Sequence, residues 1–163
     1  MSIGKDLLPE WDQEMKVTRR LLERVPGDKG EWKPHPKSFS LAHLAQLVSW
    51  MPGWVTQILT ETELNLQGGL GYSNESTETL LKLFDKNASE GRAALERAAD
   101  PDFAVAWSLK FGDQVLFTSP RGVVVRQTIS HLVHHRGQLT VYLRLLDVPV
   151  PSIYGPTADE KAW

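Results

Sequence analysis

The sequence predicts an all-α fold, a four-helix bundle, from three observations. Apolar residues recur at steps of three and four over four long segments, which is the periodicity of helices that bury one face. Serine, proline and glycine stand at the ends of these segments, where they favour helix starts and stops. Little of the chain alternates as a strand does, so we expect four helices packed around one core.

The first expected helix runs from about Lys5 to Val25 and ends at Pro26 and Gly27. A proline-containing connection over residues 28–39 follows, and proline favours an extended path there. This segment is long enough to cross one end of the bundle.

The second expected helix begins after Ser38 or Ser40, because either hydroxyl can cap a helix N-terminus. Its apolar stripe continues to about Leu64. Pro52 and Gly53 interrupt this stretch, so we expect a kink or a break near residue 52.

The third expected helix follows Ser76 and stops at residues 100–101, an Asp-Pro pair. Residues 103–117 alternate around Gly112, which predicts a short hairpin or an irregular apolar segment before the last helix. The fourth and longest helix is expected from about Pro120 to Leu146.

Composition indicates one domain over residues 1–163, since 41% hydrophobic residues suffice for a single core. The net charge of −2 comes from interspersed charges, so we expect neither a nucleic-acid nor a membrane partner. No signal peptide or membrane-spanning run is evident, which predicts a cytoplasmic protein. Cysteine is absent, so any thiol chemistry needs a thiol from a substrate or cofactor.

Three of the five histidines cluster in the fourth expected helix. Residues on a helix turn by about 100° each, so His131 and His135 share a face at about 40°, while His134 points elsewhere. This spacing suits two ligands of one metal ion. On its own the pair is a weak signal and better fits histidines that are hydrogen-bonded inside a bundle or exposed at its surface.

His43, in the second expected helix, is the third candidate ligand. Bundles build metal sites from side chains on facing helices. Three imidazoles leave a coordination position open, as in catalytic sites. Imidazole suits zinc, nickel, iron or copper, and the sequence does not choose among these divalent transition metals.

Several short motifs together resemble the DinB/YfiT-like metalloenzyme family, the damage-inducible DinB family, which is unrelated to the DNA polymerase of similar name. The resemblance covers nearly the whole chain. Its motifs are Pro34–Ser38, Leu41–Ala45, Trp54, Trp107–Leu109, Pro120 and Arg121, His131, His135–Gln138, Tyr142–Arg144, Tyr154–Pro156 and Ala158–Glu160.

This resemblance implies a bundle in up-down-down-up order, usually a homodimer, that holds one divalent metal through His43, His131 and His135. The family includes enzymes that use low-molecular-weight thiols. We therefore expect a metal-dependent enzyme with a small-molecule substrate, a thiol transferase or a hydrolase-like metalloenzyme. The alternatives are a non-catalytic metal-binding or stress-response protein and a helical interaction module without metal.

Residues around the histidines have less specific interpretations. Gln138 and Tyr142 lie near the direction of His131 and could hydrogen-bond a metal-bound water or ligand, although core packing or polar satisfaction explains them better. Arg136 points away, so we expect a surface or subunit-interface ion pair. Trp54 and Trp107, like Trp50, are expected in the core rather than as substrate walls.

Overall fold

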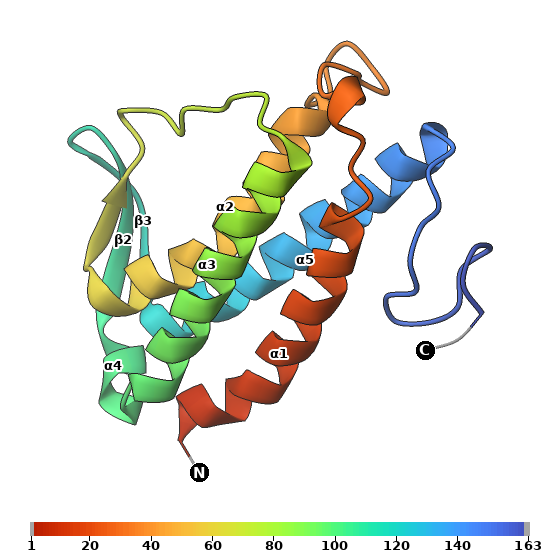
Figure 1. Cartoon of the computed structure of the whole chain (residues 1–163). Coiled ribbons are helices and arrows are strands. Elements are labelled where there is room, and N and C mark those ends of the chain that lie inside the picture. Colours follow the sequence, from red (N-terminus) through yellow and green to blue (C-terminus); the bar gives the residue numbers. More distant parts are fainter. Residues whose placement is uncertain (1, 162–163) are drawn as a thin grey trace.

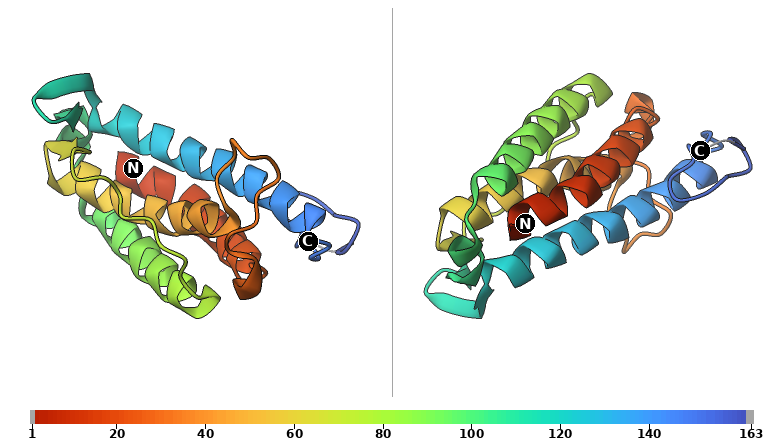
Figure 2. Two further views of the ribbon diagram at one scale, coloured as in Figure 1. Left: turned by 90° about the horizontal axis from the view of Figure 1, so that it is seen from above. Right: turned by 90° about the horizontal axis from the view of Figure 1, so that it is seen from below.

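Four long helices form the body of the computed structural model, which describes residues 2–161 (Figure 1). They are α1 (Ile3–Leu22), α2 (Leu41–Thr60), α3 (Thr77–Arg97) and α5 (Arg121–Leu145). Two short elements, the 3₁₀ helix η1 (Gly27–Lys29) and the helix α4 (Asp100–Ala104), lie in the connections. Figure 1 shows α1 and α5 running in one direction and α2 and α3 in the opposite one, and Figure 2 shows the four side by side.

The predicted all-α fold class is wrong, because a three-stranded mixed sheet accompanies the helices. Its strands are β1 (Glu63–Asn65), β2 (Ala106–Phe111) and β3 (Gln114–Pro120), in the order β1-β2-β3. The alternating segment before the last helix forms the antiparallel β2–β3 hairpin, which turns at Gly112 with φ +59°. Strand β1 joins β2 in parallel, so α3 and α4 form the crossover between two strands of one sheet.

The sheet closes one end of the bundle, beside the end of α2 and the start of α5 (Figure 1). Leu64 pairs with Leu109, and Leu109 pairs with Phe117, so one apolar side chain from each strand stands in a row across the sheet. Side chains in such a row point to the same face of a sheet. This row therefore gives the sheet an apolar face toward the helices.

Local capping explains where the helices start. The Ser40 hydroxyl accepts from the backbone N–H of His43 at 3.3 Å, and the Ser76 hydroxyl accepts from that of Thr79 at 3.1 Å. Pro120 stands at the N-cap of α5, where its missing N–H costs nothing. Pro52 lies inside α2 and does not break it, since α2 is helical from residue 41 to residue 60.

A close approach of three helices fixes the middle of the core. Gly91 of α3 faces Trp11 of α1 and the carbonyl of Pro52 of α2, and a Cβ at this position would lie 2.6 Å from the Trp11 ring. The Trp11 indole N–H donates to the carbonyl of Ala88 at 3.2 Å, which ties α1 to α3. Glycine is required here by lack of space rather than by its backbone angles.

None of the helices within residues 2–161 combines the length and the apolar character needed to cross a membrane.

Candidate metal centre and adjoining cavity

The structure brings together two of the three predicted ligands, both on α5. The Nε2 atoms of His131 and His135 lie 2.9 Å apart. His135 is buried, whereas His131 is exposed toward the cavity described below. The four-residue spacing therefore places the two imidazole rings as the helix geometry predicts.

Gln138 fixes the proton arrangement of this pair. The Nδ1–H of His135 donates to Oε1 of Gln138 at 2.7 Å, so the Nε2 atom of His135 keeps its lone pair. His131 must then donate its own Nε2–H to His135 when no metal is bound. A hydrogen bond that holds one ring nitrogen is the usual way in which proteins orient a metal-binding histidine.

His43, the third predicted ligand, lies apart from the pair. Its ring stacks between Phe39, at a centroid distance of 4.1 Å, and Tyr72, at 3.5 Å. Its Nε2 atom is buried and has no hydrogen-bond partner. In their positions in this structure, no three histidine, aspartate or glutamate side chains among residues 2–161 form a group that could hold a metal ion.

The surroundings keep all three imidazoles neutral. Burial lowers the pKa of His43, His131 and His135, because a low-dielectric environment disfavours the charged ring. Charge repulsion from His135 and then from His134 lowers the pKa of His131 further. For His135, the hydrogen bond to Gln138 raises the pKa in part, and His134 lowers it. Neutral imidazole is the form that binds a metal, so this environment favours metal binding near pH 7.

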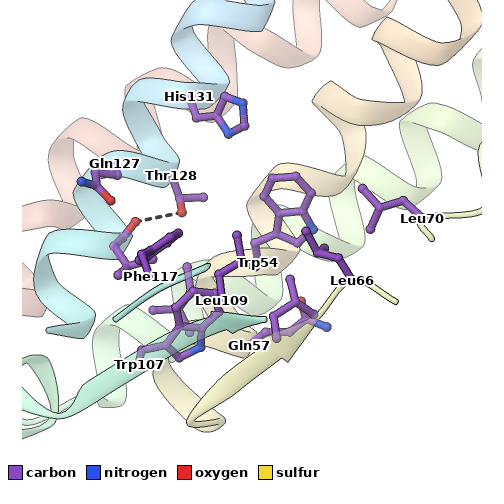
Figure 3. A pocket seen from close by; sticks show the side chains of 13 residues that line it. Trp54, Gln57, Leu66, Leu70, Trp107, Leu109, Phe117, Gln127, Thr128 and His131 are labelled. Carbon is purple, nitrogen blue, oxygen red and sulfur yellow. Dashed lines mark hydrogen bonds between the residues drawn. The ribbon is translucent and has the colours of Figure 1, made fainter. Parts of the chain in front are cut away.

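A cavity of about 380 Å³ opens beside His131. Its walls come from α2, α5, the sheet and the segment after β1, as Figure 3 shows. The lining is mostly apolar and consists of Trp54, Gln57, Ile58, Leu64, Leu66, Leu70, Trp107, Leu109, Phe117, Val124, Gln127, Thr128 and His131. Trp54 and Trp107, which we expected in the core rather than as substrate walls, thus also form walls of this cavity.

Arg136 contradicts the expectation of a surface or interface ion pair. It is only 1% exposed, and its guanidinium forms an ion pair with Glu14 of α1, which is 7% exposed. It also donates to the hydroxyl of Thr18 at 3.1 Å and to that of Tyr154 at 2.6 Å. The Tyr154 hydroxyl in turn donates to Glu14 at 2.9 Å. This cluster, which is buried except for the exposed Tyr154, joins α1, α5 and the C-terminal segment.

Sequence reasoning missed Glu14, although a signal was present. Glu14 lies three residues after Trp11 and four before Thr18, within the stripe of α1 that faces the core. A charged residue at such a position predicts a buried partner of opposite charge.

The remaining singled-out residues have other roles. The Tyr142 hydroxyl donates to the carbonyl of Phe39 at 3.1 Å, and the Tyr142 ring packs edge-on against Trp32. His134 is exposed, with its ring 4.9 Å from that of His135. Tyr142 therefore serves packing and polar satisfaction.

Together the bundle, its small sheet and the paired histidines define a helical protein with a candidate metal centre beside an apolar cavity. The DinB family model matches residues 1–162, and the chain belongs to the DinB family, as the resemblance of its motifs predicted.

Relatives of known sequence or structure support the same fold. The chain is 25% identical over 156 residues to the uncharacterized protein YrdA of Bacillus subtilis, covering 95% of this chain and 90% of that protein. It is similar in fold to a DinB-like protein of Bacillus cereus, with a TM-score of 0.71 and 22% identity over 92% of this chain and 97% of the other. A DinB-like protein of Bacillus subtilis, YjoA, also gives a TM-score of 0.71, with 17% identity over 96% and 99% of the two chains.

The buried cluster generates a stability prediction. Replacing Arg136 by Met leaves Glu14 as an uncompensated buried charge, and we expect a loss of about 3–5 kcal/mol in the free energy of unfolding, measured in urea. The matched control is Arg126→Met, which removes an exposed ion pair between the same two helices, to Glu10, and should cost only about 0–1 kcal/mol. Equal losses in the two variants would contradict the assigned role of Arg136.

Proposed function

We propose that the protein is a divalent-metal-dependent enzyme whose metal is held by His43, His131 and His135. The observation that carries this proposal is the His131–His135 pair, with its Nε2 atoms 2.9 Å apart and the second nitrogen of His135 held by Gln138. Metal–nitrogen bonds of about 2.0–2.1 Å at tetrahedral angles separate two ligand nitrogens by about 3.3 Å. A side-chain shift of a few tenths of an ångström would therefore fit the pair to one ion.

The unpartnered ring nitrogen of His43 suits a third metal ligand. Its buried Nε2 atom lacks a partner, and an unsatisfied buried polar atom is costly unless a ligand satisfies it. Its neighbour Phe39 also lies beside His135, at a ring centroid distance of 6.4 Å. The proposal requires the His43 ring to leave its stack with Phe39 and Tyr72 and turn toward the pair.

The metal would supply Lewis acidity, which lowers the pKa of a thiol or a water at the open position. Gln138 holds the His135 ring in one orientation, and His131 stands where the metal centre meets the cavity. The apolar walls keep water away from a second substrate.

The finer proposal is transfer of a low-molecular-weight thiol, because the chain has no cysteine of its own. The thiol gives up its proton, its sulfur forms a bond to an electrophilic carbon of the substrate, and the leaving group departs with the bonding electron pair. The leaving group takes up a proton, so the products are a thioether and the protonated leaving group.

Metal analysis of protein purified without a histidine tag tests the ligand assignment. We expect about one divalent ion per chain in the wild type and a loss of at least about tenfold in metal affinity in His135→Ala, which removes a ligand. Gln138→Leu should weaken metal binding by about 10- to 100-fold, since the His135 ring loses its orienting bond. His134→Ala is the matched control and should keep the metal.

Equal metal content in the wild type and His135→Ala would contradict the proposal. The rival function is a non-catalytic metal-binding or stress-response protein, which makes the same prediction for metal content. Assay of metal-loaded protein with small thiols and an electrophile panel separates the two, because the rival predicts no thioether product. The cytoplasmic location and the absence of nucleic-acid partners stay predictions of the sequence.

We also propose a homodimer through α5. Val123, Val141 and Leu145 are exposed on this helix, the last two at 55% and 57%. Positions 123 and 141 are 18 residues apart, which is about five helical turns, so these side chains share one face. Exposed polar side chains, Gln127, Ser130 and His134, lie between them on that face. A second copy of α5 would cover these apolar and polar side chains in a symmetric contact.

Sedimentation equilibrium tests the dimer. We expect two 18.3 kDa chains for the wild type and one for Val141→Glu, because a charge in the contact opposes burial. Leu116→Glu places the same charge on an exposed apolar residue of β3 and should leave the dimer intact. A wild type that sediments as a single chain at every concentration would rule the contact out.

A further inference from the structure

The cavity beside His131 is too large to be a packing defect. Native cores contain few voids larger than a water molecule, whereas this cavity holds about 380 Å³. Pockets for small ligands measure about 300–1,000 Å³. The cavity is therefore of a size that suits a small molecule.

Among residues 2–161, no aspartate, glutamate, lysine or arginine lines this cavity. Its polar groups are the amides of Gln57 and Gln127, the hydroxyl of Thr128, the ring of His131 and the indole N–H groups of Trp54 and Trp107. The N–H of Trp107 is buried and has no hydrogen-bond partner among these residues. The Thr128 hydroxyl already donates to the carbonyl of Val124 at 2.9 Å. A charged group placed against these walls would lose its hydration without gaining an ion pair, which is costly. The lining thus selects against ions.

Three aromatic rings from three different elements line the cavity. Trp107 of β2 and Phe117 of β3 lie with their ring centroids 6.1 Å apart, and Trp54 comes from α2. Figure 3 shows His131 at one end of the labelled side chains, with Trp107 and Gln57 at the other. Flat ring systems gain most from such walls, because aromatic faces and edges attract one another beyond the area that they bury.

We propose that this cavity binds an uncharged, flat aromatic molecule of about two fused rings, with its reacting group toward His131. The size follows from comparison with benzene, which fills an engineered apolar cavity of about 150 Å³. In the function proposed above, this molecule is the electrophile, so its role as substrate rests on that function. Its binding does not, because the walls are apolar side chains that need no metal.

Ligand-observed NMR titration of metal-free protein tests this inference with three probes. Acetylnaphthalene is flat and neutral, naphthoate has the same rings with a negative charge, and acetyldecalin is neutral but not flat. We expect acetylnaphthalene to bind at least about tenfold more tightly than naphthoate, which corresponds to about 1.4 kcal/mol. Acetyldecalin should bind more weakly than acetylnaphthalene because it cannot stack.

A pair of variants locates the binding. Leu66→Trp places a large ring in the cavity and should reduce acetylnaphthalene binding at least about tenfold, since the space is filled. Leu116→Trp adds the same ring on β3, where Leu116 is 47% exposed and outside the lining, and should leave binding unchanged.

Equal affinity for all three probes, or no binding of acetylnaphthalene, would overturn the inference, and this comparison needs only the wild type. The outcome is separable from that of the metal analysis. If the protein binds metal but does not discriminate among the probes, only the proposed substrate class is wrong. If it binds acetylnaphthalene but no metal, the proposed metal-dependent function is wrong and the cavity inference holds.

Discussion

The buried ion pair between Arg136 and Glu14 is the constraint on which the site depends. It joins α5 to α1 through two charges that have almost no contact with solvent. A buried pair of this kind tolerates little displacement, because each charge is stable only beside its partner. Rotation of α5 about its axis would separate them. Since His135 precedes Arg136 directly, the pair also fixes the face on which His131 and His135 stand.

The C-terminal segment strengthens this arrangement. Tyr154 hydrogen-bonds to both members of the pair, and its ring lies 5.1 Å from the Arg136 guanidinium. Burial and the bond to Glu14 raise the pKa of the Tyr154 hydroxyl more than the Arg136 charge lowers it, so the hydroxyl stays protonated and able to donate. One side of α5 thus contacts α1 and the C-terminal segment, and another side bears His131 and His135.

The sheet gives the site its second component. Without β1, β2 and β3, the end of the bundle beside His131 would lack Leu64, Leu109 and Phe117, which form part of the cavity wall. The helices hold the histidines, and the sheet supplies much of the apolar surface that lines the cavity. The histidine pair and the cavity are thus built by different elements, although His131 belongs to both.

Local sequence signals predicted much of this structure. Periodicity located the four long helices, the serines at 40 and 76 marked two of their starts, and the four-residue spacing paired His131 with His135. Strand β1 was missed because three residues show no periodicity, and their partner in β2 lies far along the chain. The short helix α4 was missed because its Asp-Pro start also fits a helix stop.

Long-range contacts explain the remaining errors. The predicted fold class was wrong because the β2–β3 hairpin pairs with a third strand from a distant segment. The residue pattern within a single segment does not reveal such a pairing. Arg136 was expected at a surface because its partner Glu14 is on another helix. The position of the His43 ring depends on Phe39 and Tyr72, two neighbours outside α2, so periodicity alone does not determine it.

The proposed metal centre requires that three imidazoles bind one ion. X-ray absorption spectroscopy of the zinc-loaded protein measures this directly, because it reports the type, number and distance of the ligand atoms. We expect three imidazole nitrogens at about 2.0–2.1 Å in the wild type and two in His43→Ala. The same number of nitrogens in both proteins, or a metal held mainly by oxygen, would contradict it.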